Sequence, residues 1–464
     1  MRGNSHVRFL KGKAGETPPT YLIGILTKYI RIKSFRSGCI MHRKGNTTIY
    51  DGIYLQSIRS KTIMVKNFFL KSDKSPKNIQ IKKDIITHFI TSGNDTIAEL
   101  AKELDLSVPT VTKFIAELTD QGLIAEFGKI HTPGGRHPSV YGLNPSSAYF
   151  VGVDMSRHHL NIALMDFTGN IVDNQMGISY TAENTPESFD LLCAHIQHFI
   201  DKTGDLKQKI FDINLNISGR VNPESGYSYS SFYFNERPVS ETLTKRLNYN
   251  VGIDNDTRAM AYGEYMKGVV EGEQQVIFVN VSWGLGIGII IDGKPYYGKS
   301  GFSGEFGHFP IFENEIICHC GKKGCLETEA SGLAIHRMVL ERIANGESTL
   351  LTEMVKDLNR LTLTDIIKAT NMEDPLCIEI VEEVGYKLGK YIAGLINIFN
   401  PELVVIGGQV AETDGFIMLP IRSSVRKYSL NLVNKDTQIV ASKLKNKAGI
   451  IGACMIARSR LFAE

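Results

Sequence analysis

Three cysteines lie close together in the chain, ten residues downstream of a histidine. Cys318, Cys320 and Cys325 fall within eight positions and are separated by glycines, which allow tight turns, and His308 precedes them. Three thiolates and one imidazole match the tetrahedral ligand set of Zn²⁺, and four protein ligands leave no open position for a substrate. The spacing therefore predicts a structural zinc site that fixes a loop, rather than a hydrolytic centre. The alternative is three ordinary cysteines without a metal.

Further polar residues lie near this loop or upstream of it and indicate a ligand site. Glu305 and His308 share one short segment, and Glu327 follows the last cysteine by two residues. Upstream, Asn255 and Asp256 end a predicted strand. Carboxylates and an amide together supply the fixed donors and acceptors that suit sugar diols. His308 could hold zinc with one ring nitrogen and a hydroxyl with the other; the alternative for the two glutamates is local capping or pairing.

The segment before this region has the pattern of a DNA-binding module. Apolar residues at helical spacing predict one helix from Ile81 to Ile90, Thr96 opens a second helix, and Ser107 can cap a third. Two short helices joined by a tight turn form a helix-turn-helix, whose last helix enters the major groove with its N-terminal residues near the bases. The predicted DNA contacts on this helix are Ser107, Thr110, Thr112 and Lys113.

Two predicted strands follow the third helix and form a hairpin wing. They cover residues 123–126 and 139–143, and the tip between them carries glycines, prolines and Arg136, which suits a narrow minor groove. Residues 71–140 hold nine basic and nine acidic side chains, so bulk charge does not indicate DNA. The order and spacing of the elements do predict binding to a double-stranded DNA operator, against the alternative of a small helical subdomain with a solvated hairpin.

Length and composition set the outer bounds. The chain has 464 residues, 42% of them hydrophobic and 22% charged, which fits a globular protein of two to four domains. No apolar run is long enough to span a membrane, no secretory signal is recognisable, and seven cysteines are too sparse for a disulfide scaffold. We therefore expect a cytoplasmic protein with no membrane partner.

The first 63 residues are strongly basic, with twelve Lys and Arg against Glu16 and Asp51. A nucleic-acid-binding arm is one interpretation. The composition favours a disordered arm, or a segment upstream of a natural start at Met64.

From Tyr149 onward, predicted strands alternate with predicted helices, which is typical of α/β architecture. Strands are expected at residues 150–154, 160–166, 209–217, 276–281, 287–291 and 403–406, and helices at 186–201, 257–266, 332–344 and 375–399. We expect two α/β lobes with a cleft between them.

From about Ile81 onward the chain resembles the ROK family (repressors, open reading frames and kinases), in the branch with an N-terminal winged helix-turn-helix typified by N-acetylglucosamine and xylose repressors. The most specific element of the resemblance is Gly307-His308 followed by the segment Cys318 to Glu327. The resemblance implies a two-lobed actin-like (ribonuclease H-like) ATPase fold. It also implies a homodimer or homotetramer, and sugar binding by the matching residues Asn255, Asp256, Glu305, His308 and Glu327. In the family's kinases the residue matching Asp256 is the catalytic base.

Both glycine-rich turns that hold ATP phosphates in the family's kinases are altered here. The first reads Asp154-Met155-Ser156-Arg157-His158, and the second, Ser282 to Gly288, carries the chain's single tryptophan, Trp283. Side chains therefore stand where phosphate transfer needs open backbone donors. We expect no catalytic residue, and predict a repressor that responds to a sugar, amino-sugar or sugar phosphate; the alternative is a ROK sugar kinase with an appended DNA-binding domain.

The expected organisation has four parts: an extension and linker at 1–76, a winged helix-turn-helix domain at 77–145, lobe I at 146–262 plus 448–464, and lobe II with the zinc loop at 263–447.

Overall fold

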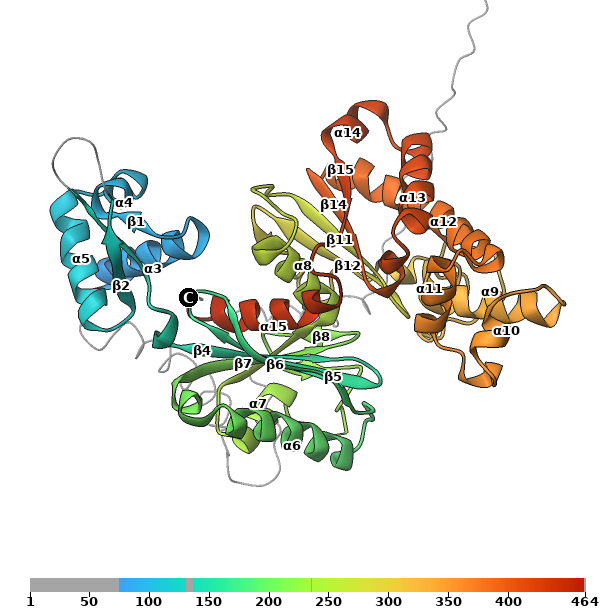
Figure 1. Cartoon of the computed structure of the whole chain (residues 1–464), viewed down its shortest axis with the longest axis horizontal. Coiled ribbons are helices and arrows are strands. Elements are labelled where there is room, and N and C mark those ends of the chain that lie inside the picture. The colour runs from blue at the N-terminus through green and yellow to red at the C-terminus, as the bar shows by residue number, and fades with distance from the viewer. Residues whose placement is uncertain (1–74, 131–136, 235, 463–464) are drawn as a thin grey trace, which may run out of the picture. The chain divides into compact units, whose positions relative to one another are not determined.

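The computed structural model describes residues 75–130, 137–234 and 236–462. The predicted DNA contact Arg136 and the basic extension lie outside these residues, and so does Cys39. Figure 1 shows the order of the elements along the chain. Among the described residues, no helix combines the length and apolar content that a membrane crossing requires.

The first part is a three-helix unit with a small sheet. Its elements are α3 (Pro76–Thr91), β1 (Asp95–Thr96), α4 (Ile97–Glu103), α5 (Val108–Asp120), β2 (Ile124–Lys129) and β3 (Ser139–Leu143), with strand order β1-β3-β2. Local caps start the two short helices: the Thr96 side chain accepts from the backbone of Glu99, and that of Ser107 from Thr110. The predicted helix-turn-helix and wing are therefore present.

One charged residue lies inside the core of this unit. Lys82 on α3 is fully buried, and its ammonium lies 2.7 Å from the Glu117 carboxylate on α5. The sequence pattern places a lysine in solvent, whereas the structure uses Lys82 to join α3 to the third helix of the motif.

The second part, lobe I, is built on a five-stranded sheet with order β10-β7-β4-β5-β6. Its strands are β4 (Tyr149–Met155), β5 (His159–Asp166), β6 (Ile171–Ser179), β7 (Ile210–Ile217) and β10 (Val251–Asn255). β4, β5 and β6 are antiparallel neighbours, whereas β7 and β10 extend the sheet in parallel with β4. The remaining elements are α6 (Pro186–Lys202), α7 (Val239–Leu247), the hairpin β8 (Val221–Asn222) with β9 (Tyr227–Ser228), and α15 (Ala448–Ser459), which packs on β4 and β7.

The third part, lobe II, repeats the same sheet plan with order β13-β12-β11-β14-β15. Its strands are β11 (Val276–Val281), β12 (Leu285–Ile291), β13 (Lys294–Pro295), β14 (Leu403–Gly407) and β15 (Gln438–Ala441). Its helices are α9 (Gly332–Ala344), α10 (Leu351–Met354), α11 (Leu363–Asn371), α12 (Pro375–Phe399), α13 (Gly415–Tyr428) and α14 (Asn431–Asp436). α8 (Asp256–Lys267) packs against both α15 and β12 (Figure 1).

Two sheets, each with three antiparallel strands followed by two parallel ones, confirm the α/β expectation and the two-lobed actin-like plan. Some strand boundaries differ from the expected ones. β2 runs to Lys129, not Glu126, and β12 begins at Leu285, not at Ile287, because a tight hairpin pairs Leu285 with Val281. The expected domain boundaries stay a prediction.

Candidate functional site

The predicted DNA-reading surface lies on the first turns of α5. The Ser107 hydroxyl lies 2.7 Å from that of Thr110, so these two side chains cap the helix together. Thr112 donates to the carbonyl of Val108 at 2.8 Å. The Lys113 side chain is 61% exposed, with its ammonium 3.8 Å from Glu117, and it is the one cation among the four described candidates for contact with a phosphate or base.

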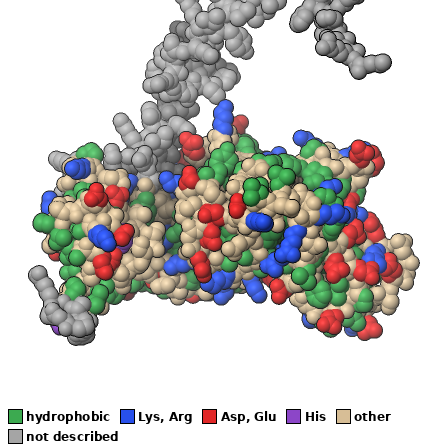
Figure 2. All heavy atoms as spheres, turned by 90° about the horizontal axis from the view of Figure 1, so that it is seen from above, with side chains coloured by type: hydrophobic (Ala, Val, Ile, Leu, Met, Phe, Trp, Pro, Cys, Tyr) green, Lys and Arg blue, Asp and Glu red, His purple; other side chains and the backbone are tan. Residues whose placement is uncertain are grey.

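Surface charge alone does not mark a nucleic-acid face. On the side of the molecule drawn in Figure 2, blue Lys and Arg side chains are interspersed with red Asp and Glu side chains. The case for DNA therefore rests on the winged helix-turn-helix geometry.

The four predicted metal ligands come together. One ligand atom each from His308, Cys318, Cys320 and Cys325 lies within 4.8 Å of the others. Nδ1 of His308 is 3.6 Å from the Cys318 sulfur, and the sulfurs of Cys320 and Cys325 are also 3.6 Å apart. The cluster can hold a metal ion.

Glu327 connects this cluster to the start of β12. Its side chain is buried, and one oxygen accepts from the backbone N–H of Leu285 at 2.9 Å. The other oxygen lies 2.8 Å from Nδ1 of His319, a residue that sequence reasoning left out of the site. The hydrogen bond from His319 and that from Leu285 hold the pKa of Glu327 below its usual range against the effect of burial. Glu327 therefore has the local partners that the alternative interpretation expected.

Two glycines allow the segment with Glu305 and His308 to lie against strand β12. A Cβ at Gly304 would lie 2.1 Å from the carbonyl oxygen of Ile287, and one at Gly307 would lie 2.3 Å from that of Leu285, so only glycine allows this approach. Nε2 of His308 is 3.6 Å from a Glu305 oxygen, whereas Nδ1 faces the cysteines. The two ring nitrogens of His308 thus face different groups, the cysteine sulfurs on one side and the Glu305 carboxylate on the other.

Asn255 and Asp256 lie where β10 of lobe I ends and α8 begins. The Asn255 side chain caps α8 by accepting from the backbone of Arg258 at 3.0 Å. Asp256 accepts from the Ser218 hydroxyl at 2.5 Å and from the backbone of Thr257 at 2.7 Å, while burial raises the pKa of its carboxyl. The Thr257 hydroxyl would lie 3.1 Å from a Cβ on Gly286.

The segments that carry the predicted effector residues lie next to the first residues of β12. Thr257, next to Asp256, meets Gly286; Glu327 bonds Leu285; and the segment with Glu305 and His308 packs on that strand too. Ser218 was missed because it lies far away in sequence, and its only signal was its place directly after β7.

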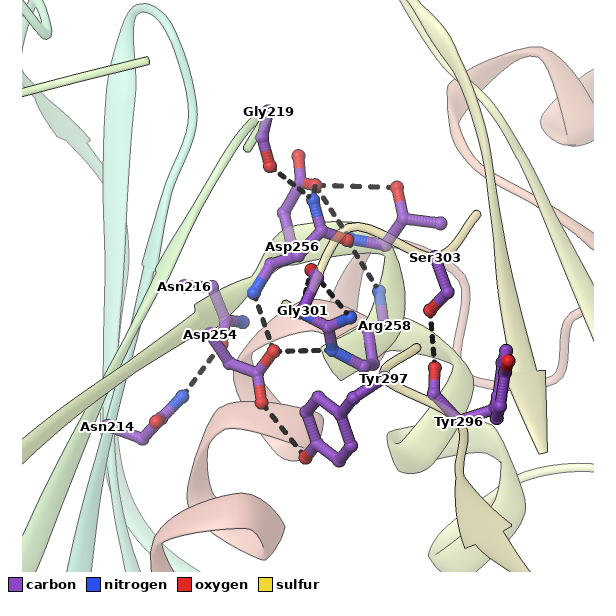
Figure 3. A network of polar contacts seen from close by, with 12 residues as sticks. Asn214, Asn216, Gly219, Asp254, Asp256, Arg258, Tyr296, Tyr297, Gly301 and Ser303 are labelled. Atoms are coloured by element: carbon purple, nitrogen blue, oxygen red, sulfur yellow. Dashed lines mark hydrogen bonds and ion pairs between the residues drawn. The ribbon is translucent and has the colours of Figure 1, made fainter. Parts of the chain in front are cut away.

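A buried ionic network around Asp254 and Arg258 lies next to Asp256 (Figure 3). Nε of Arg258 donates to Asp254 at 2.6 Å, and the Tyr297 hydroxyl donates to the other oxygen of that carboxylate at 3.2 Å. Both terminal guanidinium nitrogens donate to the carbonyl of Gly301. Burial next to Asp254 raises the pKa of Tyr297 well above its usual range.

In the first altered phosphate turn, donors of Ser156 and His159 bond to acceptors within the turn. The backbone N–H and the hydroxyl of Ser156 both donate to the carbonyl of His159, at 3.0 and 2.9 Å. The backbone of His159 donates back to the Ser156 hydroxyl at 3.2 Å. The turn between β4 and β5 is thus closed by hydrogen bonds of its own.

The second turn, between β11 and β12, is similar. The Ser282 N–H donates to Gly284 at 3.1 Å, and the Leu285 N–H is taken by Glu327. The carbonyls of Ser282 and Trp283 accept from the first two N–H groups of α9. Trp283 is 37% exposed and its ring lies 5.3 Å from the His336 ring on α9, while the Ser282 and Leu285 N–H groups of this turn already have acceptors within the chain.

Asp154 begins the first turn and is itself perturbed. It accepts from the Asn216 amide at 3.0 Å, yet burial, reinforced by the nearby charge of Asp256, raises its pKa from 3.8 to about 6.

Fold and site together define a winged helix-turn-helix module followed by a body of the sugar-kinase type. Residues 81–125 match the winged helix-turn-helix DNA-binding model, and residues 150–460 match the ROK family model. The chain belongs to the ROK family.

The chain is similar to known repressors, regulators and kinases. The xylose repressor of Caldicellulosiruptor bescii is 28% identical over 381 residues, covering 82% of this chain and 94% of that protein. A crystal structure of a ROK family transcriptional regulator, a homologue of the E. coli MLC protein, is 27% identical with a TM-score of 0.70, covering 82% of this chain and 96% of its own. The Streptomyces griseus ROK glucokinase in complex with glucose and AMPPNP is 27% identical with a TM-score of 0.60, covering 67% of this chain and all of its own.

Proposed function

We propose that this chain is a sugar-responsive, DNA-binding transcriptional repressor. One observation carries the proposal: a helix-turn-helix with an open reading surface precedes a kinase-type body in which the segments with the sugar-side residues meet at the start of β12, while each phosphate turn has backbone donors bonded within the chain. Asn255, Asp256, Glu305, His308 and Glu327 are proposed to bind the effector, and Ser107, Thr110, Thr112, Lys113 and Arg136 to contact the operator.

The proposed response needs two arrangements of the chain that bind the effector unequally. A sugar held between Asp256 on lobe I and Glu305 on lobe II favours the closed arrangement of the lobes. In a homodimer on a palindromic operator, the two reading helices must match half-sites that are spaced by whole helical turns. Closure of the lobes changes the spacing of these two helices, so they no longer match both half-sites. Binding of the effector then lowers the affinity of the protein for the operator.

We propose that the metal is structural Zn²⁺. Bond lengths of about 2.3 Å for Zn–S and about 2.0–2.1 Å for Zn–N imply tetrahedral edges of roughly 3.8 Å between sulfurs and roughly 3.5 Å between sulfur and nitrogen. The measured 3.6 Å for both pairs fits these edges. When bound, the metal would fix the loop that carries Glu327 and would orient His308 toward Glu305.

The operator is found by selecting duplexes from a random pool with the purified protein, and is then used in gel-shift titrations with and without sugar. Xylose, glucose, N-acetylglucosamine and the 6-phosphates of the last two are the probes. We expect a selected duplex whose affinity falls at least tenfold with one of them. No enriched duplex, or affinity that none of the probes changes, would contradict the proposal.

Lys113→Ala tests the reading surface, with Lys356→Ala as the matched control because Lys356 is an exposed lysine in lobe II. We expect only Lys113→Ala to weaken operator binding and to reduce its salt dependence, since it removes one phosphate or base contact. Equal effects of the two variants would place the reading surface elsewhere.

The second candidate is a ROK sugar kinase with an appended DNA-binding domain, favoured by the intact Asp256 and by the likeness to the glucokinase. It predicts sugar-dependent release of ADP from ATP that Asp256→Asn abolishes. Absence of turnover with all probe sugars, together with operator binding, excludes this alternative.

A further inference from the structure

The buried side chain of Arg258 joins the two halves of the proposed effector site. Arg258 is 2% exposed, and its guanidinium lies 4.4 Å from the centre of the Tyr297 ring. Asp254, 1% exposed, pairs with Nε, while the Gly301 carbonyl accepts from both terminal nitrogens at 3.2 and 3.3 Å. Figure 3 shows that the partners come from different segments of the chain.

One side of this contact is the end of β10. Asp254 is followed immediately by Asn255 and Asp256, and its carboxylate also accepts from the Asn255 backbone at 2.7 Å. Arg258 lies on α8, and its own backbone N–H is capped by Asn255 at 3.0 Å. The Arg258–Asp254 pair therefore fixes the strand end and the helix start that carry these effector residues.

The other side is the loop that leads to Glu305. Tyr297 and Gly301 both lie in this loop, between β13 and Glu305. Gly301 has φ +79°, and a Cβ there would lie 2.7 Å from both the Val221 carbonyl and Pro223. The loop is therefore hydrogen-bonded to Arg258 and packed closely against β8 at Gly301.

We propose that Arg258, with Tyr297, is a positioning residue of the effector site: it locks the loop carrying Glu305 to the strand end carrying Asn255 and Asp256. This inference rests on the proposed function, because it concerns that site. A buried guanidinium is stable only with its partners in place, so this contact favours the arrangement in which the two segments meet, and a preorganised site spends less free energy on ordering when a sugar binds.

The test removes one hydroxyl without disturbing the core. Tyr297→Phe leaves Asp254 with one donor fewer, and Tyr296→Phe is the matched control because the neighbouring Tyr296 is 46% exposed and enters the network through its backbone carbonyl. We expect Tyr297→Phe to raise the Kd of the bound probe sugar, measured by calorimetry, about tenfold. The control, the zinc content and the operator affinity without sugar should stay unchanged.

A ligand-free measurement separates this inference from the proposed function. Amide hydrogen exchange of residues 296–305 should become faster in Tyr297→Phe and in Arg258→Lys, which cannot present the same planar fork, with no change in the cysteine loop. If the parent protein binds none of the probe sugars, the proposed function fails and exchange alone decides the inference. Parental exchange in Tyr297→Phe, or equal sugar affinity in Tyr297→Phe and Tyr296→Phe, overturns it.

Discussion

Replacing the buried Asp154 by asparagine should stabilise the protein at neutral pH. Burial raises the pKa of this carboxyl from 3.8 to about 6. At neutral pH the native state must therefore hold an ionised group that prefers to be neutral. At 1.36 kcal/mol for each pH unit, the penalty is about 3 kcal/mol.

The sign follows from proton binding. Between pH 4 and 6 the native state holds a proton on Asp154 that the unfolded chain has already lost, so this group lowers stability as pH rises through that window. Above about pH 6 both states are ionised and the penalty is constant. An asparagine keeps the oxygen that accepts from the Asn216 amide at 3.0 Å and carries no charge at any pH.

Urea unfolding of the parent and Asp154→Asn at intervals from pH 4.5 to 8 measures the effect. The gain in free energy of unfolding should be small at pH 4.5 and rise to about 3 kcal/mol above pH 6.5. Asp205→Asn removes the same charge at an exposed position, and its free energy of unfolding should depend on pH in the same way as that of the parent. A stability difference that does not vary with pH would refute the reasoning.

Three further predictions concern other parts of the molecule. Cys320→Ser should lose the bound metal, measured by elemental analysis, whereas Cys193→Ser, at a buried cysteine outside the cluster, should retain it; full metal content in the first variant would refute the ligand assignment. Glu117→Ala should destabilise the winged domain by about 3 kcal/mol, because it removes the carboxylate that lies 2.7 Å from the buried ammonium of Lys82; amide hydrogen exchange should become faster within residues 76–143 and stay unchanged in the two lobes. Asp256→Asn should abolish the stabilisation that the probe sugars give in a thermal-shift assay; an unchanged shift would remove Asp256 from the effector site.

Local signals made several helix boundaries predictable. α9 and α12 begin where Ser331 and Asp374 accept from backbone groups of their first turns, and such caps are readable from short stretches of sequence. The metal cluster was predictable for the same reason, since three of its four ligands lie within eight residues.

Contacts distant in sequence could not be predicted in this way. Arg258 meets Gly301, 43 residues away, and no spacing rule brings them together. A proline within a helical pattern predicts a break, yet α13 continues through Pro420. His319 lay between two cysteines and had no pattern of its own, because its partner Glu327 is defined by the fold of the loop.

The place of α15 has a consequence for how the protein is made. This helix packs on β4 and β7, although nearly three hundred residues separate it from β4 in the sequence. A ribosome therefore finishes the winged head and all of lobe II before lobe I receives the helix that covers its sheet. A frameshift or stop codon between β10 and α15 removes that helix, so the truncated product would carry the winged helix-turn-helix domain and a lobe I without its covering helix.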